Sequence, residues 1–292
     1  MKLATFTTEN NNTPRVGIVR DDGIIDLSQL TGIPPTMKTI LTGGEGVLTK
    51  LRDVESSRTD TIDLATINVC APVQDPGKIL AIGLNFGDHI EETGAEPPKH
   101  QLWFNKQHNC VNSPHGDINL PSVSTMLDFE GELCVVIGKR CKHVPRDRAH
   151  EVIAGFCVGN DVSVRDWQFR SQTMQIGKSF DTHGPTGPYL VTPDEVGDPH
   201  NLNLRTYVNG EERQNSNTRH LIFDCYDAIA HLTQAFTLDV GDILFMGTPA
   251  GVGIASKPPV YLKVGDVVRV EIEKLGHIEN KVVAEQADCI IE

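Results

Sequence analysis

Two glutamates one residue apart, Glu130 and Glu132, stand directly before an uninterrupted apolar run from Leu133 to Ile137. Because this run has no charged residue on either face, it predicts a strand that is covered on both sides. Alternate side chains of a strand share a face, so the two carboxylates project the same way and repel each other when both are ionised. A hard divalent cation would relieve that repulsion, so the pair predicts half of a metal site. The alternative is an exposed edge strand on which the two acids only maintain solubility.

Length and charge narrow the classes of protein. A chain of 292 residues can form one large domain, or a large domain and a small one. The formal net charge of −13 argues against nucleic acid or an anionic membrane as partner, since both favour a basic patch, but allows a small anionic substrate. Residues 1–17 lack the apolar core of a secretory signal, and no run reaches membrane-spanning length. The cysteines are scattered without Cys-x-x-Cys spacing, which indicates reduced thiols and a cytoplasmic protein, with an organelle matrix as the alternative.

Short apolar stretches separated by turn residues predict a β-rich α+β fold. We expect a small N-terminal α+β domain over residues 1–70, with one helix at 37–54, and a larger catalytic domain over residues 71–292. In the larger part we expect helices at 146–153 and 224–237. The expected strands cover residues 3–7, 15–20, 23–26, 78–83, 133–137, 152–158, 202–208, 242–246, 260–262 and 267–272.

Three further elements can join the glutamate pair in one site. Asp161 follows an apolar strand and can supply a third oxygen ligand. His89 and Glu92 are three residues apart, so on a short helix the carboxylate can orient the imidazole as a general base. Lys178, beside a metal site, can hold a substrate carboxylate or a developing oxyanion. Taken singly, these residues have plainer interpretations as a turn former, a surface helix pair and a solvated lysine; only their joint occurrence favours a site.

Longer motifs resemble the fumarylacetoacetate hydrolase family, particularly its domain-containing protein 2 and bacterial homologues. The motifs that carry the resemblance are Lys78 to Asn85, Asp128 to Glu132, Asn160 to Gln168, Gly177 to Thr182, Arg205 to Thr218 and Gly247 to Gly253. Residues 1–70 resemble the more variable N-terminal part of the family. Phe86 and the pair His183-Gly184 depart from the usual family residues near the pocket, which leaves the identity of the substrate open.

The resemblance implies a mixed β-roll enzyme that uses Mg²⁺ or Mn²⁺ and is usually a homodimer. It places the metal ligands at Glu130, Glu132 and Asp161. It places a water-activating dyad, on a lid that orders over the substrate, at His89 and Glu92. It implies contacts with the substrate, or a place in the pocket wall, for Lys106, Arg165, Gln168, Lys178 and Thr248.

The expected activity is hydrolysis of a carbon–carbon bond in a short 2,4-diketo acid of the acylpyruvate or fumarylacetoacetate type. In that reaction His89 deprotonates the attacking water and Lys178 holds the developing negative charge. The alternatives on the same site are oxaloacetate decarboxylation or tautomerisation and isomerisation of a 2-oxo dioate, none of which needs attack by water. A third interpretation is a non-catalytic binding domain with a structural metal, against which an open coordination site argues. In each enzymatic case the partner is a small anionic oxo acid.

Overall fold

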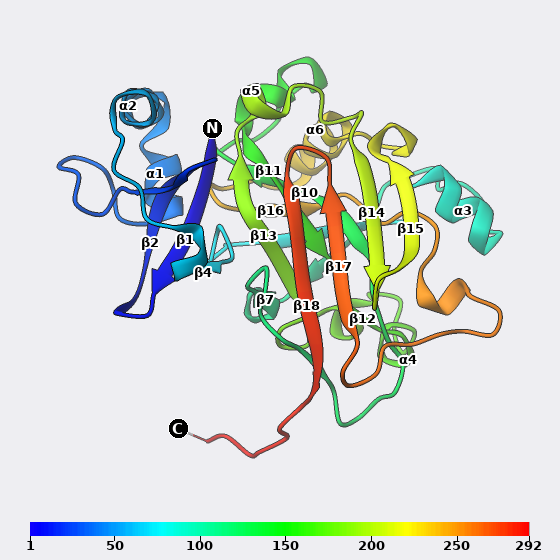
Figure 1. The fold of residues 1–292 in the computed structure, drawn as a ribbon. Helices are drawn as coiled ribbons and strands as arrows, with labels where there is room; N and C mark the ends of the chain where they lie inside the picture. Colours follow the sequence, from blue (N-terminus) through cyan, green and yellow to red (C-terminus); the bar gives the residue numbers. More distant parts are fainter. Residues whose placement is uncertain (292) are drawn as a thin grey trace.

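The computed structural model describes residues 1–291, and a large mixed β-sheet forms its centre (Figure 1). The strand order is β3-β2-β1-β13-β11-β10-β16-β5-β6, with β4 beside β1 and β7 beside β13. These strands are β1 Lys2–Thr8, β2 Asn11–Arg20, β3 Gly23–Asp26, β4 Ile67–Cys70, β5 Ile79–Gly83, β6 Leu102–Lys106, β7 Val111–Asn112, β10 Gly131–Ile137, β11 Ile153–Asn160, β13 Gly184–Val191 and β16 Ile243–Phe245.

A second sheet of five strands packs over β10, β11 and β13 in the order β15-β14-β17-β18-β8 (Figure 1). Its strands are β8 Ile118–Leu120, β14 Asn203–Val208, β15 Glu211–Asn217, β17 Val267–Ile272 and β18 Gly276–Ala284. A short pair, β9 Leu127–Asp128 and β12 Ser163–Val164, lies beside the metal-ligand candidates. The helices are α1 Met37–Thr42, α2 Gly44–Ser57, α3 Gly87–Thr93, α4 Arg165–Gln168, α5 Pro193–Val196 and α6 Cys225–Ala235.

Strand β10 is covered on both faces, as its unbroken apolar run predicts, and all seven of its residues are buried. Leu133 and Val135 pack with the second sheet and α6 in one core cluster. Cys134 and Val136, which point the other way, pack in a second cluster with residues of the N-terminal part. This division follows from the two-residue period of a strand. Glu130, which precedes β10, and Glu132, its second residue, are therefore placed in a buried part of the fold.

The N-terminal part continues the large sheet instead of standing apart from it. Strand β1 pairs with β13, with Lys2 opposite Val191 and Leu3 opposite Leu190. The amino group of Met1 donates to Thr192 Oγ1 and is within 3.0 Å of a carboxylate oxygen of α5. The boundary between two domains near residue 70 stays a prediction. The pairing of β1 with β13 and the core that the two parts share do not test whether each part folds independently.

Three expectations of secondary structure are wrong. The helix at 37–54 is two helices, because the chain turns at Gly43 and Gly44, and Gly44 has a φ of +61°. Residues 146–152 form a 3₁₀ helix in place of an α-helix. Residues 260–262 are irregular: they make single backbone bonds, such as Leu262 N–H to the Leu127 carbonyl, but no ladder. The expected strands at 23–26 and 267–272 are present with the expected ends, and the other strands and the helix at 224–237 are present with shifted ends.

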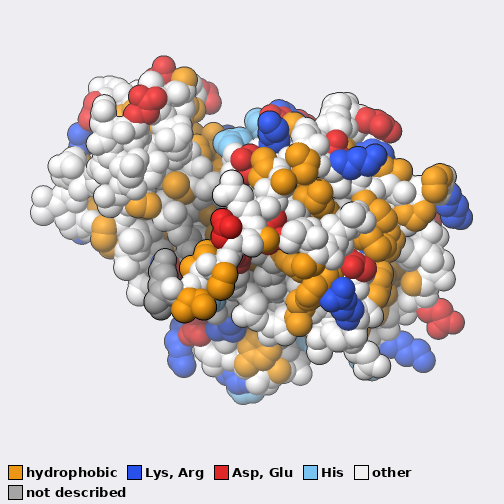
Figure 2. All heavy atoms as spheres, turned by 90° about the horizontal axis from the view of Figure 1, so that it is seen from below, with side chains coloured by type: hydrophobic (Ala, Val, Ile, Leu, Met, Phe, Trp, Pro, Cys, Tyr) orange, Lys and Arg blue, Asp and Glu red, His pale blue; other side chains and the backbone are white. Residues whose placement is uncertain are grey.

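The surface mixes charge types. On the face seen from below, Lys and Arg side chains stand singly or in small groups among acidic and apolar side chains (Figure 2). In residues 1–291, no helix combines the length and the apolar character that crossing a membrane requires.

Candidate active site

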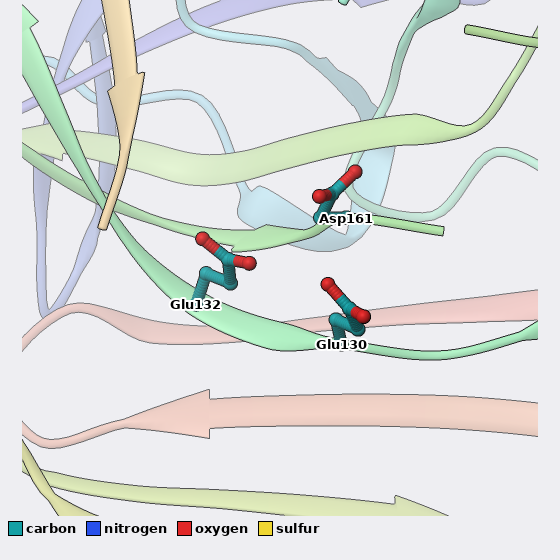
Figure 3. A group of neighbouring side chains, drawn as sticks. All are labelled: Glu130, Glu132 and Asp161. Carbon is teal, nitrogen blue, oxygen red and sulfur yellow. The ribbon is translucent and has the colours of Figure 1, made fainter. Parts of the chain in front are cut away.

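Glu130, Glu132 and Asp161 converge at one end of the β10–β11 pair (Figure 3). The antiparallel register sets Gly131 opposite Asn160, and the Asp161 N–H donates to the Glu130 carbonyl at 2.8 Å. One carboxylate oxygen from each of the three acids lies within 4.8 Å of the other two, and all three side chains are buried. The pairing of two strands therefore joins acids that are far apart in sequence.

The electrostatics of the three acids favour a cation. Burial, together with the charges of Asp161 and Glu130, raises the pKa of Glu132 well above its ordinary value. Burial would also raise the pKa of Glu130, but Lys178 and Arg165 lower it below its usual range. Three clustered carboxylates are the hard oxygen donors that Mg²⁺ and Mn²⁺ prefer. The three carboxylates therefore fit such an ion, both as oxygen ligands and because a cation would offset the repulsion among them.

Two buried lysines contact these carboxylates from different sides. Lys178 Nζ donates to Glu130 Oε2 at 2.6 Å and to Asp161 Oδ2 at 2.8 Å, and its side chain lines the pocket. Lys106 Nζ donates to Asp161 Oδ1 at 2.7 Å, to the His183 carbonyl at 3.1 Å and to the Lys178 carbonyl. All three N–H donors of the Lys106 ammonium are thus engaged. Within residues 1–291, the side chains that line the pocket do not include Lys106. Lys106 orients Asp161 from behind.

Arg165, at the start of α4, is buried between two carboxylates. Its Nε donates to Asp128 Oδ2 at 2.8 Å, and its Nη1 donates to Glu130 Oε1 at 2.6 Å. Asp128 also accepts from the N–H groups of Gly253, at 2.8 Å, and Ile254, at 2.9 Å. Asp128 therefore joins Arg165 to the segment of Gly253 and Ile254, of which Ile254 lines the pocket. Sequence reasoning did not single it out for a role, although an acid between apolar neighbours, Leu127 and Phe129, is the signal that could have found it.

The amide of Gln168 has a defined orientation. Arg165 Nη1 donates to Gln168 Oε1 at 2.8 Å, and because a guanidinium cannot accept, the amide NH₂ must face the other way. There its contact is Met174 Sδ at 3.6 Å, a weak acceptor, so the amide N–H groups can donate to a ligand. Thr248, which also lines the pocket, accepts at Oγ1 from Gln214 Nε2 at 2.8 Å, which leaves the hydroxyl hydrogen to donate.

His89 and Glu92 share a face of α3, as their spacing predicts, and His89 Nδ1 lies 3.2 Å from Glu92 Oε2. Glu92 Oε1 accepts from the Gly251 N–H at 2.9 Å, and Asp88 Oδ2 accepts from Ser216 Oγ at 2.5 Å. These bonds hold α3 against the rest of the chain. With Nδ1–H donated to Glu92, Nε2 of His89 carries the lone pair that a general base needs.

One pocket of about 300 Å³ gathers most of these groups. The polar side chains in its wall are His89, Thr93, Glu130, Glu132, Arg165, Gln168, Lys178 and Thr248. Asp161, Glu92 and Lys106 act on these groups from outside the lining. The remainder of the wall is largely apolar. The arrangement can bind a small anion beside a cation site and move a proton on it.

Comparisons with known proteins agree with this architecture. The family model described as fumarylacetoacetate hydrolase C-terminal matches residues 78–283. The mitochondrial oxaloacetate tautomerase fahd2 of Xenopus laevis is 41% identical over 288 residues, which cover 97% of this chain and 90% of the relative. The corresponding tautomerase of Rattus norvegicus is 42% identical over 287 residues, covering 97% of this chain and 92% of the relative.

Solved structures show the same fold. The maleylpyruvate hydrolase of Sphingobium sp. SYK-6, solved with manganese(II) and pyruvate, has a TM-score of 0.82 and 31% identity, covering 98% of this chain and all of that one. A fumarylacetoacetate hydrolase of Exiguobacterium antarcticum also has a TM-score of 0.82, with 30% identity and coverage of 98% and 100%. The fold and its pocket therefore define a β-rich α+β enzyme. The chain belongs to the fumarylacetoacetate hydrolase family.

Proposed function

We propose that the chain is a divalent-metal-dependent tautomerase that interconverts the keto and enol forms of oxaloacetate. One observation carries the proposal: a single pocket presents the acidic cluster, the Lys178 ammonium and the His89 ring to the same small volume. The proposal also rests on relatives 41–42% identical over nearly the whole chain that are named oxaloacetate tautomerases. It thus adopts one of the alternatives derived from the sequence over carbon–carbon hydrolysis.

Glu130, Glu132 and Asp161 would hold Mg²⁺ or Mn²⁺. When bound, the ion supplies Lewis acidity that stabilises negative charge on the oxygen atoms of a 2-oxo acid. The positive charge that it adds also offsets the excess of buried carboxylates. Lys106 keeps Asp161 in position through the contact at 2.7 Å, and Arg165 does the same for Glu130 through the contact at 2.6 Å.

The remaining steps belong to the side chains of the pocket. His89 Nε2 removes a proton from C3 of the substrate, and Glu92 stabilises the imidazolium that forms. Lys178 donates to the 2-oxo oxygen as negative charge develops there, and the imidazolium of His89 delivers the proton taken from C3 to that oxygen to give the enol. The Gln168 amide and the Thr248 hydroxyl donate to a substrate carboxylate. The reaction moves one proton from carbon to oxygen and consumes no water.

Hydrolysis of a 2,4-diketo acid is the second candidate. It is favoured by the likeness to a maleylpyruvate hydrolase solved with manganese and pyruvate. In that reaction His89 would take its proton from water, which then attacks the distal ketone, and the enolate of pyruvate would leave. Both candidates share the enolate and differ in whether water enters.

A side-by-side assay separates the two. Purified protein with Mg²⁺ or Mn²⁺ is given oxaloacetate while the enol absorbance is followed, and an acylpyruvate while pyruvate release is followed. We expect enol–keto interconversion that is faster than the uncatalysed rate and that is lost on chelation and in His89→Gln. Pyruvate release from the acylpyruvate without catalysed tautomerisation of oxaloacetate would replace the first candidate with the second.

Two further properties remain proposals. We place the protein in the cytoplasm or in an organelle matrix, the second supported by relatives that are named as mitochondrial. We also propose a homodimer, as the family resemblance implies.

A further inference from the structure

The pocket wall is apolar over much of its extent. Among its apolar side chains are those of three separate segments: Ile82, Leu84, Leu102, Phe104, Phe169 and Met174. Phe104 lies at the polar end, with its ring centroid 5.3 Å from Lys178 Nζ, so the outer wall is formed by the apolar side chains nearest to solvent. Two of them reach well into solvent, Leu102 at 44% exposure and Phe169 at 66%. Large apolar groups at a pocket mouth are costly in water unless a ligand or partner covers them.

The cations of the pocket are already paired. Among the described residues that line the pocket, only Arg165 and Lys178 carry a permanent positive charge. Arg165 contacts Asp128 and Glu130, and Lys178 contacts Glu130 and Asp161. A second carboxylate on a substrate would have the donors of the Gln168 amide and the Thr248 hydroxyl, and Arg165 Nη2, which makes no hydrogen bond. An apolar substituent would instead meet the outer wall directly.

We infer that the same site also accepts 2-oxo acids that carry an apolar substituent at C3, of the arylpyruvate class, and interconverts their keto and enol forms. The inference rests on the proposed tautomerase function and adds a second class of substrate to it. The carboxylate and the 2-oxo oxygen occupy the inner, polar end, and the ring lies against the outer wall. The C3–H bond breaks, an O–H bond forms on the 2-oxo oxygen, and no oxidant, reductant or water is consumed.

The pocket volume agrees with this assignment. About 300 Å³ corresponds to roughly ten water molecules at ~30 Å³ each. An aromatic ring at C3 that lies in this space buries apolar surface of both the ligand and the wall, which stabilises the complex by about 25 cal/mol per Å².

Phenylpyruvate and oxaloacetate are the probes for the test, each with Mn²⁺-loaded protein. The variant is Leu102→Arg, which places a cation at the mouth on a half-exposed residue and so leaves the core untouched. Val264→Arg, at a residue 56% exposed that is not part of this pocket, is the matched control. We expect catalysed tautomerisation of both acids by the wild type, with kcat/KM values within about tenfold, or ~1.4 kcal/mol, of each other. Leu102→Arg should lower the ratio of phenylpyruvate to oxaloacetate kcat/KM by about tenfold, and Val264→Arg should leave it unchanged.

Binding measured by calorimetry gives a readout that does not depend on turnover. Phenylpyruvate should bind the Mn²⁺-loaded wild type at least as tightly as oxaloacetate does, and more weakly after Leu102→Arg. Catalysis of oxaloacetate alone, or a ratio that Leu102→Arg does not change, would overturn the inference and leave the proposed function standing. If neither acid is turned over, the proposed function fails, and weaker binding of phenylpyruvate than of oxaloacetate then overturns the inference as well.

Discussion

Nζ of Lys178 lies 2.8 Å from Oδ2 of Asp161, at the floor of the pocket. The same ammonium lies 2.6 Å from Glu130 Oε2, so one lysine bridges two acids that we assign to a metal ion. An ion at these oxygens and the ammonium repel each other. The lysine therefore competes with the ion for these oxygens, and its third N–H can donate to the substrate.

Lys178→Met tests this relationship. Removal of the cation leaves the acids more negative, so we expect Mn²⁺ to bind more tightly while kcat falls by about 10²–10³-fold. The metal-free variant should be less stable by about 3–5 kcal/mol, because two buried carboxylates lose a partner. Calorimetry, kinetics and urea unfolding measure the three effects. Lys50→Met, at an exposed residue, serves as the control. Weaker Mn²⁺ binding would show that Lys178 assists the ion instead of competing with it.

His89→Gln should separate proton transfer from metal binding. The ring lines the pocket but is not among the three clustered acids, so we expect kcat to fall by about 10²–10⁴-fold while the Kd for Mn²⁺ is unchanged. Glu92→Gln should lower kcat less than His89→Gln does, because the amide oxygen of the glutamine can still accept from the Gly251 N–H. His231→Gln, on the exposed face of α6, is the control. Full turnover without the His89 imidazole would remove it as the base.

Glu132→Gln tests the acidic cluster as a metal site. The amide can still accept from the Gly247 N–H, which now donates to Glu132 Oε2 at 2.6 Å, so we expect the fold to be retained. In the wild type, Mn²⁺ at 100 times its Kd should add about 2.7 kcal/mol to the free energy of unfolding, and the variant should lose this gain. Without metal the variant should be at least as stable as the wild type, since one like charge is removed. Thermal unfolding with and without Mn²⁺ measures this, with Glu9→Gln as the control. An equal metal-induced shift in both proteins would exclude Glu132 as a ligand.

Gly177→Ala probes how the segment that carries Lys178 is placed. A Cβ at this position would lie 2.2 Å from the Gln168 backbone nitrogen, so the two segments must separate. We expect a fall in kcat together with a lower melting temperature, because Lys178 moves with its neighbour. Gly46→Ala, in α2 with nothing within 4 Å of the added Cβ, should instead leave kcat unchanged and stabilise the protein by about 0.5–1 kcal/mol. Unaltered kinetics in Gly177→Ala would mean that the contact does not position Lys178.

Local patterns were sufficient for much of the fold. The unbroken apolar run after Glu132 predicted a doubly covered strand, and the spacing of His89 and Glu92 predicted their contact on one helical turn. Sequence patterns predicted the wrong secondary structure where it depends on more than side-chain periodicity. Residues 260–262 look like a strand, but beside the short strand β9 they make a single backbone bond, from Leu262 to Leu127, and form no ladder. The glycines at 43 and 44 divide a helix that side-chain periodicity alone would continue.

The order of residues along the chain determined which side chains could form a site, because strand alternation and helical spacing act over a few residues. Tertiary structure decided their partners. Lys106 contacts Asp161, and Asp128 joins Arg165 to Gly253 and Ile254, each through contacts between distant segments. Such contacts depend on strand pairing and on the requirement that each buried charge find an opposite one, which no local spacing encodes.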